Sequence, residues 1–233
     1  MRFLALGLAA TFAVAGCAVS NTPYPRAASP VVYRAPPGPN HFTTAPRAPL
    51  HSEVFVCNSW SSNLGLIGDR GEVSNYRPYM DTAAGPLLRT PIDVACFSSG
   101  FGWRGAATGG GRQHNGIDLA NPEGGYVYAA GDGWVRFAGE RGGYGIVLEL
   151  DHGRGVLTRY AHLNEIDPNL QPGMFVAAGA PVARMGMTGN ATGVHLHYEV
   201  VIDGLLVDPM NYGVPQYVTT PVIDAAPTDT PEF

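Results

Sequence analysis

Short apolar runs separated by glycine-containing turns constrain the fold more than any other feature of the sequence. The runs lie within 125–139, 144–150, 155–163, 174–186 and 193–207. Those at 144–150 and 193–200 alternate as half-buried strands do. The 233 residues include 31 glycines and 20 prolines, and no long helical pattern occurs. We therefore expect a mainly β protein, built as an antiparallel β-sandwich or an open, barrel-like sheet.

Two turns within this region have distinct signatures. Asp132-Gly133 lies between two β-like runs and predicts a hairpin. Asp151-His152-Gly153 predicts a tight turn between the runs 144–150 and 155–163, in which His152 would be exposed to solvent.

The first residues have the features of an export signal. Arg2 precedes the apolar run FLALGLAATFAVAG, which is shorter than the roughly 20 residues that cross a bilayer. The four residues Val14–Cys17 read VAGC and resemble the lipobox of bacterial lipoproteins. We expect residues 1–16 to be a signal peptide and Cys17 to be lipidated; the alternative is a plain secretory signal that contains a cysteine. Ala18, rather than an aspartate, follows Cys17, which favours a lipid anchor in the outer membrane, facing the periplasm of the cell envelope.

Composition divides the rest of the chain into four parts. Residues 17–50 are rich in proline and alanine, which predicts an extended, unpacked and disordered tether. Residues 51–90 form a small β accessory segment that is too short to fold without the part that follows. The regular β pattern occupies residues 91–213. Residues 214–233 are again proline-rich and mildly acidic, which predicts a disordered tail.

The charged residues exclude nucleic acid as a partner. The net charge is −5, and the 14 basic residues are all arginines scattered along the chain. Nothing in the sequence resembles the basic stripe of a nucleic-acid-binding protein.

Two cysteines remain after Cys17. In an oxidising compartment Cys57 and Cys96 could form a disulfide, and closing a loop of about 40 residues would stabilise the fold by roughly 4 kcal/mol on the chain-entropy model. The alternative is two separately buried thiols, because Cys96 lies in the apolar stretch VACF.

A pair of histidines occupies the last strand-like run. His195 and His197 are two residues apart, so in a strand they share one face with Glu199. Leu196 and Tyr198 would then pack in the core from the opposite face. Burying two imidazoles without partners is costly, so we expect these histidines to line a surface or groove. The alternative is a pair of exposed strand histidines with no role.

A second motif supplies further candidate metal ligands. His114 and Asp118 are four residues apart around Gly116, which argues against a helix. Imidazole and carboxylate groups are typical ligands of catalytic zinc, which takes three protein ligands and leaves one position for water. His114, Asp118 and one of the two strand histidines would supply these ligands. The alternative for His114 is a loop histidine near a surface turn.

The remaining histidines are less informative. His162 ends the run 155–163, and Tyr160 lies two residues earlier on the same expected face. His162 could converge on the same groove or be an ordinary strand-end residue. His41 and His51, in and at the end of the tether, have no constellation of polar residues around them.

Together these motifs resemble the lysostaphin/LytM-type zinc metallopeptidases, which are cell-wall endopeptidases. The family's His-x-Gly-x-Asp element stands at 114–118, its Tyr-x-His-Leu element at 160–163, and its His-Leu-His-Tyr-Glu element at 195–199. Shorter matches are SSGFGWR (98–104), VYAAGDGWV (127–135), GGYG (142–145) and MTGNATG (187–193).

The resemblance covers about residues 86–212. It departs from the family pattern at Val194, where a proline is usual, and in the short glycine-rich loop between Arg104 and His114. The stretches LLRTPID (87–93) and VDPMNY (207–212) look most like Gram-negative murein DD-endopeptidases, which carry a small β segment before the catalytic domain.

The resemblance implies a LytM-type peptidase domain over 91–213 and a role for each site residue. His114, Asp118 and His197 would bind one Zn²⁺, and His162 and His195 would be the catalytic histidines beside it. Further candidates to support the ligands or to contact the substrate are Tyr160, Asn190 and Glu199. Glu199 could fix an imidazole tautomer or form a salt bridge on its strand.

The implied activity is zinc-dependent hydrolysis of the peptide cross-links of peptidoglycan, with stem peptides as substrate and envelope regulators as candidate partners. A second class of function is that of a non-catalytic activator of cell-wall amidases with this fold, which predicts missing ligands, whereas all five positions are filled here. A third is a peptidoglycan-binding lipoprotein with an inactive site.

Overall fold

The computed structural model describes residues 41–58, 61–65, 67–105 and 111–210. The predicted signal peptide, the lipidated Cys17, most of the tether and the tail at 214–233 lie outside the described residues. Among the residues described, no helix has the length and apolar character needed to cross a membrane.

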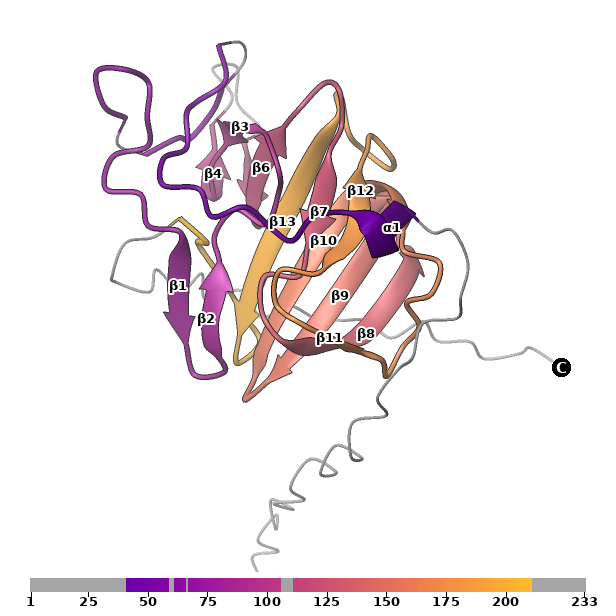
Figure 1. Ribbon diagram of the computed structural model, residues 1–233. Helices are drawn as coiled ribbons and strands as arrows, with labels where there is room; N and C mark the ends of the chain where they lie inside the picture. Colours follow the sequence, from indigo (N-terminus) through magenta and orange to yellow (C-terminus); the bar gives the residue numbers. More distant parts are fainter. Residues whose placement is uncertain (1–40, 59–60, 66, 106–110, 211–233) are drawn as a thin grey trace, which may run out of the picture. The chain divides into compact units, whose positions relative to one another are not determined.

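Antiparallel strands are the main regular structure of the described chain (Figure 1). The main sheet contains β3 (Cys96–Ser99), β6 (Ile117–Ala120), β7 (Tyr126–Tyr128), β8 (Gly133–Glu140), β9 (Ile146–Gly153), β10 (Val156–Ile166), β11 (Phe175–Val176), β12 (Pro181–Met185), β13 (His195–Ile202) and β14 (Leu205–Val207). Its order is β11-β8-β9-β10-β13-β6-β3, with β12 beside β10 and β7, and β14 beside β13. Two separate hairpins join β1 (Tyr79–Thr82) to β2 (Gly85–Leu88) and β4 (Gly102–Arg104) to β5 (Arg112–His114). The prediction of a mainly β, antiparallel fold is confirmed.

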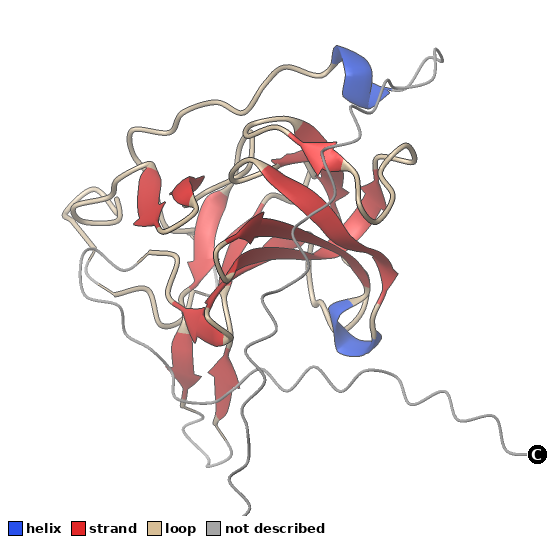
Figure 2. Ribbon diagram, turned by 90° about the horizontal axis from the view of Figure 1, so that it is seen from below, coloured by secondary structure: helices blue, strands red, loops and turns tan. Residues whose placement is uncertain are grey.

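The longest strand, β10, connects two parts of the sheet and bends at His162. It pairs with β9 from Val156 to Leu163 and with β12 from Leu163 to Ile166. The register with β9 shifts between Tyr160 and Leu163, and His162 has a positive φ of 59°. Such an irregularity bends a strand and redirects its side chains. The strands of this curved sheet consequently surround one hydrophobic core (Figure 2).

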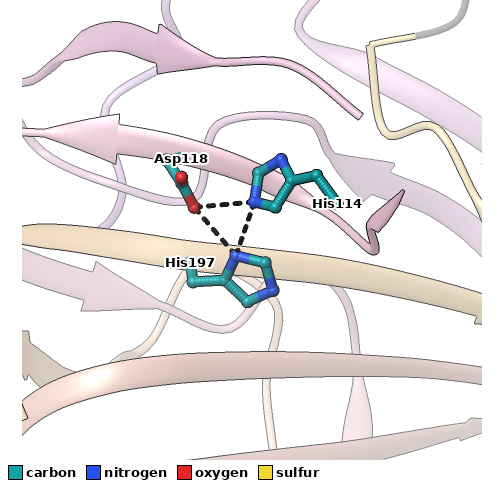
Figure 3. A group of neighbouring side chains, drawn as sticks. All are labelled: His114, Asp118 and His197. Atoms are coloured by element: carbon teal, nitrogen blue, oxygen red, sulfur yellow. Dashed lines mark hydrogen bonds and ion pairs between the residues drawn. The ribbon is translucent and has the colours of Figure 1, made fainter. Parts of the chain in front are cut away.

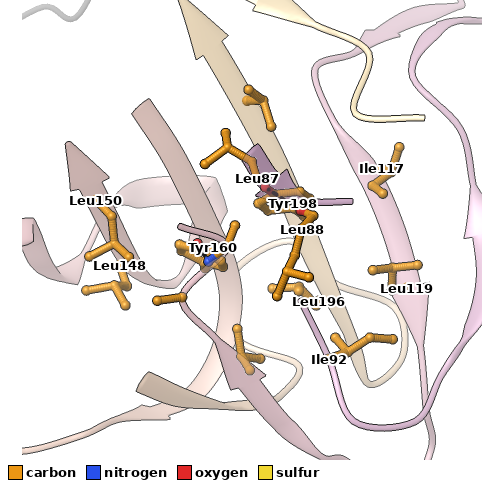
Figure 4. Packing of buried hydrophobic residues seen from close by; sticks show 14 of the residues in the cluster. Leu87, Leu88, Ile92, Ile117, Leu119, Leu148, Leu150, Tyr160, Leu196 and Tyr198 are labelled. Atoms are coloured by element: carbon orange, nitrogen blue, oxygen red, sulfur yellow. Dashed lines mark hydrogen bonds between the residues drawn. The ribbon is translucent and has the colours of Figure 1, made fainter. Parts of the chain in front are cut away.

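Branched and aromatic side chains fill this interior (Figure 4). Leu148, Leu196, Tyr160 and Tyr198 are fully buried there. Truncating one such leucine to alanine typically costs about 2–5 kcal/mol of stability. Leu196 and Tyr198 face the core as expected, which leaves the histidines of β13 on the opposite face.

The accessory segment at 51–90 packs onto the main sheet. Val54, Val73 and Leu87 belong to the same buried apolar cluster as the sheet residues. Cys57 and Cys96 form a disulfide, so of the two alternatives for these cysteines the cross-linked one holds. The segment thus depends on the main domain both for its core and for a covalent link.

The hairpin predicted at Asp132-Gly133 does not form. β7 pairs with β12, whereas β8 pairs with β9 and β11, so the two runs lead to different neighbours. The Asp132 carboxylate instead accepts a hydrogen bond from the Ala178 N–H at 2.7 Å. The dipeptide marks a turn, but the strands on either side of it are not partners.

His152 is buried, contrary to the expected exposure. Strand β9 continues through Gly153, so the turn moves on to Arg154-Gly155. The imidazole of His152 is enclosed between the Asp132 carbonyl, 2.7 Å from Nδ1, and the Thr158 hydroxyl, 2.8 Å from Nε2.

The last ten residues of the predicted tether contact the domain at a few points. His41–Thr44 form the short helix α1, and Phe42 is buried, edge-on to Tyr126. Arg47 and Ala48 donate hydrogen bonds to backbone carbonyls of the loop before β12. One buried aromatic ring, one side-chain hydrogen bond and one backbone hydrogen bond connect this stretch to the domain.

Candidate metal centre and active site

The three predicted ligands are brought together by strand pairing. His114 ends β5, in the hairpin with β4. Asp118 on β6 lies directly opposite His197 on β13. Opposed residues of an antiparallel pair place their side chains on the same face. The register therefore joins Asp118 and His197 across 79 positions of sequence.

The ligand atoms form a small triangle (Figure 3). His114 Nε2 lies 3.1 Å from both Asp118 Oδ1 and His197 Nδ1, and Asp118 Oδ1 lies 2.8 Å from His197 Nδ1. Ligand atoms about 2.1 Å from a tetrahedral zinc ion would lie about 3.4 Å from one another. The observed triangle fits such an ion after a small expansion. In the described part of the chain this is the one group of three metal-ligand side chains.

Hydrogen bonds behind the rings aim their lone pairs at this triangle. His114 Nδ1 lies 2.7 Å from the Gly100 carbonyl oxygen, which only accepts, so Nδ1 carries the proton. His197 Nε2 donates to the Glu199 carboxylate at 3.0 Å. In the neutral rings, Nε2 of His114 and Nδ1 of His197 therefore face Asp118 with free lone pairs. Two oriented imidazoles and a carboxylate fit a metal ion that keeps a further position open.

The cluster is strongly coupled electrostatically. Burial acts to raise the pKa of Asp118, but hydrogen bonds with His114 and His197 outweigh it and hold that pKa well below its usual range. Burial acts to lower the pKa of His197, yet its bonds to Asp118 and Glu199 raise it to about 9. A proton on His197 thus balances the carboxylates, and a metal cation would have to displace it.

The other two histidines stand beside the ligands. The ring centroid of His162 lies 4.8 Å from that of His195 and 5.7 Å from that of His197. His162 Nδ1 lies 2.8 Å from the Thr188 carbonyl, and His195 Nδ1 lies 2.8 Å from the Gly193 carbonyl. Each neutral ring therefore keeps Nε2 for other partners. Burial lowers the pKa of His162 to about 4, so the ring is neutral at pH 7.

All five side chains line one open cavity of about 330 Å³. The rest of its lining is mostly polar and consists of Arg104, Arg112, Gln113, Asn115, Gly143, Tyr144, Asn190, Ala191, Thr192 and Glu199. Asn190, which was predicted to contact the substrate or support a ligand, thus lines the cavity. No described residue of the accessory segment lines the cavity.

A buried network of charged side chains holds His197 on the side of the ring away from the ligand triangle. Glu199 is fully buried and accepts hydrogen bonds from His197, from the Tyr144 hydroxyl at 2.8 Å and from Arg159. Arg159 also donates to Glu149 at 2.7 Å. Burial acts to raise the pKa of Glu199, but the bond with His197 and the charges of His197 and Arg159 lower it. Glu199 therefore combines the two alternatives considered for it: it orients an imidazole, and it pairs with a cation.

Tyr160 is not part of the site, contrary to the prediction. It is fully buried, its hydroxyl accepts the Ala130 N–H at 2.8 Å, and its ring lies 5.5 Å from that of Tyr198. The bend of β10 is the reason. Strict alternation would put Tyr160 and His162 on one face, whereas the left-handed backbone at His162 turns its ring to the other.

Sequence reasoning missed three supporting residues. Arg104 Nη2 lies 2.7 Å from Asp118 Oδ2, and Tyr144 and Arg159 both bond to Glu199. Arg159 had a readable signal, because a charged residue inside an apolar strand needs a buried partner. Tyr144 stands in the GGYG turn, where nothing in the sequence indicates its direction.

A curved antiparallel sheet, with two histidines and an aspartate gathered beside two further histidines, defines a metallopeptidase domain of the lysostaphin/LytM type. Residues 112–209 match the sequence profile of peptidase family M23, so this part of the chain is a peptidase M23 domain. The resemblance inferred from the motifs is thereby confirmed.

Several proteins of known name are similar to part of the chain. The DD-carboxypeptidase/endopeptidase Mpg of Neisseria meningitidis is 42% identical over 104 residues, which are 45% of this chain and 24% of that protein. The peptidoglycan DD-endopeptidase ShyA of Vibrio cholerae is 37% identical over 108 residues, 46% of this chain and 25% of that protein. The chain spans about a quarter of the length of these two relatives.

One similar solved structure is described as a zinc containing peptidase from Vibrio cholerae. It superposes with a TM-score of 0.51 at 32% identity, over 59% of this chain and 47% of that one.

Proposed function

We propose that the protein is a zinc-dependent endopeptidase that hydrolyses peptide cross-links of bacterial peptidoglycan. The observation that carries the proposal is the convergence of three oriented ligand atoms with the side chains of His162 and His195 in one open cavity. The names of the relatives Mpg and ShyA support the choice of substrate.

Three side chains would hold the zinc ion: His114 through Nε2, Asp118 through Oδ1 and His197 through Nδ1. When bound, the ion supplies a Lewis acid and lowers the pKa of a water molecule towards neutrality. Arg104 holds the second oxygen of Asp118, and Glu199 holds the far nitrogen of His197, so both ligands are fixed before the ion arrives.

His162 and His195 would handle protons and charge. Backbone carbonyls fix both rings through Nδ1, so Nε2 of each can act on a substrate in the cavity. One imidazole accepts a proton from the attacking water, and the other donates to the carbonyl oxygen or to the leaving amine. Burial keeps His162 unprotonated at neutral pH, so this ring can accept a proton.

The proposed location follows from the N-terminal sequence. A lipid on Cys17 would anchor the protein in the outer membrane, and the proline-rich residues that follow would give the domain reach towards stem peptides in the periplasm. The Cys57–Cys96 disulfide suits an oxidising compartment of this kind. Mass spectrometry of the mature N-terminus tests the anchor, and an unmodified Cys17 in a protein that still sediments with membranes would contradict it.

Digestion of purified cross-linked muropeptides tests the activity. Zinc-loaded protein should convert dimeric muropeptides to monomers whose masses show hydrolysis of the cross-link, and a chelator should stop the reaction until zinc is restored. A His152→Gln variant is the matched control, because it alters a buried histidine that does not line the cavity. If zinc-loaded wild type cleaves nothing but stimulates a cell-wall amidase, the activator function replaces this proposal.

A further inference from the structure

Part of the accessory segment runs beside β3, the strand next to the candidate metal site. We call its described residues 55–57 and 62–63 the clamp. Val56 and Phe97 form a parallel bridge, as do Ser62 and Ser99. The Cys57 N–H donates to the Phe97 carbonyl at 3.0 Å. The clamp therefore adds a short parallel edge to β3.

The clamp ends at Gly100, immediately beyond β3. The Gly100 N–H donates to the Ser62 carbonyl at 2.9 Å, and the Asn63 side chain donates to the Phe101 carbonyl. The approach is so close that a β-carbon on Gly100 would lie 1.7 Å from the Asn63 carbonyl oxygen. The peptide groups on both sides of Gly100 are thus held by clamp residues.

Gly100 in turn orients a metal ligand. Its carbonyl accepts the His114 Nδ1–H at 2.7 Å, which fixes the ring and leaves Nε2 for the metal. β3 also pairs with β6, with Ser99 opposite Asp118, and Ser98 Oγ donates to the Asp118 carbonyl at 3.1 Å. Two of the three ligands therefore rest on the strand that the clamp borders.

Hydrogen bonds and the disulfide hold the clamp in place, whereas Val56 is its one side chain packed against the apolar core. Phe55 is 41% exposed, and Ser62 and Asn63 are exposed as well. A segment with few buried apolar contacts opens locally at low cost. The bond from Cys57 to Cys96 ties it covalently to the first residue of β3.

We propose that the Cys57–Cys96 disulfide positions the metal ligands through the clamp, so that opening the disulfide weakens zinc binding while the domain stays folded. A dithiol reductant would supply two electrons and two protons, break the one S–S bond, leave two thiols, and itself become a disulfide. The inference rests on the proposed function, because it concerns the zinc that the site would hold.

Zinc affinity of the full chain, measured by competition with a chromophoric chelator, tests the proposal without relying on activity. The double variant Cys57→Ser/Cys96→Ser opens the link without adding thiols that would bind zinc themselves. It should bind zinc about 10–100-fold more weakly than wild type, as is typical when support behind a ligand is lost. The variant Asn63→Gly keeps the disulfide and the positive φ at this position but removes the bond to Phe101, and should give a smaller loss.

Val176→Ala is the matched control, because Val176 is buried on β11, at the other end of the sheet order from β3. It should lower stability but leave zinc affinity unchanged. Wild-type affinity in the double variant would overturn the proposal and leave the proposed function intact. Wild-type affinity in Asn63→Gly alone would overturn the route through the clamp. Absence of zinc binding in wild type itself would remove the proposed function and this inference together.

If the double variant loses its near-UV circular dichroism, the disulfide is required for folding rather than for positioning, and the proposal fails in that form.

Discussion

The buried histidine near the turn of the β9–β10 hairpin, His152, differs in its partners from the two buried histidines of the metal cluster, His114 and His197. His152, near the turn, is 7% exposed, as is His114 in the metal cluster. Both nitrogens of His152 meet neutral oxygens, the Asp132 carbonyl and the Thr158 hydroxyl. Its hydrogen-bonding capacity is complete within the protein, so it has a structural role.

The two ligand histidines, His114 and His197, are equally enclosed but converge on one charged group. Each uses one nitrogen on a supporting acceptor and turns the other towards the Asp118 carboxylate. His114 Nε2 and His197 Nδ1 approach within 3.1 Å, which two facing lone pairs tolerate only with a proton or a cation between them. Burial therefore does not distinguish a structural histidine from a metal ligand, whereas convergence of two imidazole nitrogens on one carboxylate oxygen does.

The largest expected contrast is in metal content. His114→Ala removes one of three ligands and should leave almost no zinc bound. His152→Gln should keep the full zinc content while losing about 1–3 kcal/mol of unfolding free energy for its buried hydrogen bonds. Metal analysis and denaturant unfolding of both variants measure this, and full zinc content in His114→Ala would remove His114 from the ligand set.

The next contrast lies inside the cavity. His162→Ala should retain zinc but lose about 10²–10⁴-fold in turnover on cross-linked muropeptides, the usual contribution of a general acid or base. His41→Ala, at an exposed position in α1, is the matched control and should behave as wild type. Loss of zinc from His162→Ala would show that the residue holds the metal instead.

A smaller loss of zinc affinity is expected from changing Glu199, which supports the ligand His197. Glu199→Gln removes the charge that orients His197 and should weaken zinc binding about 10–100-fold. Glu149→Gln is the matched control, since Glu149 pairs with the same Arg159 but does not touch a ligand. Both variants should lose stability, and only the first should lose affinity. Equal zinc affinities would mean that Glu199 acts only as the partner of Arg159.

The two histidine groups should also respond to pH with opposite signs in metal-free protein. Burial lowers the pKa of His152 below its ordinary value of 6.5, so its contribution to stability is complete above that pH and is lost as the pH falls through the depressed value. The pKa of His197 is raised to about 9, so its contribution is complete below 6.5 and is lost as the pH rises through 9.

Denaturant unfolding of metal-free wild type, His152→Gln and His197→Gln, measured from below pH 6.5 to above pH 9, separates the contributions of the two histidines. His152→Gln should flatten the acidic side of the stability profile and His197→Gln the alkaline side. The reverse assignment would contradict the hydrogen-bond geometry of both residues.

The face of β13 that carries the site could be predicted because a strand has a strict two-residue period. That period placed His195, His197 and Glu199 together, and the structure agrees. The motif spacing also gave the pairing of His114 with Asp118. The meeting of Asp118 with His197 was not contained in any local pattern, because it depends on the register of two strands far apart in sequence.

Local rules failed where the backbone departs from regular geometry. The bulge at His162 separated this residue from Tyr160, and no residue type nearby announces a bulge. Asp132-Gly133 formed its turn, but tertiary pairing decided that the flanking strands have different neighbours. The residues 41–50 read as unpacked from their prolines, because the burial of Phe42 depends on a surface that only the folded sheet provides.

Zinc content and turnover measured side by side for His195→Ala and His197→Ala test the central claim most directly. The two residues share a strand face, but only His197 directs Nδ1 into the ligand triangle, and His195 Nε2 remains 3.7 Å from Asp118 Oδ1. We predict that His195→Ala keeps one zinc and loses cleavage of cross-linked muropeptides, whereas His197→Ala loses both. Loss of zinc from His195→Ala with retention in His197→Ala would contradict the account.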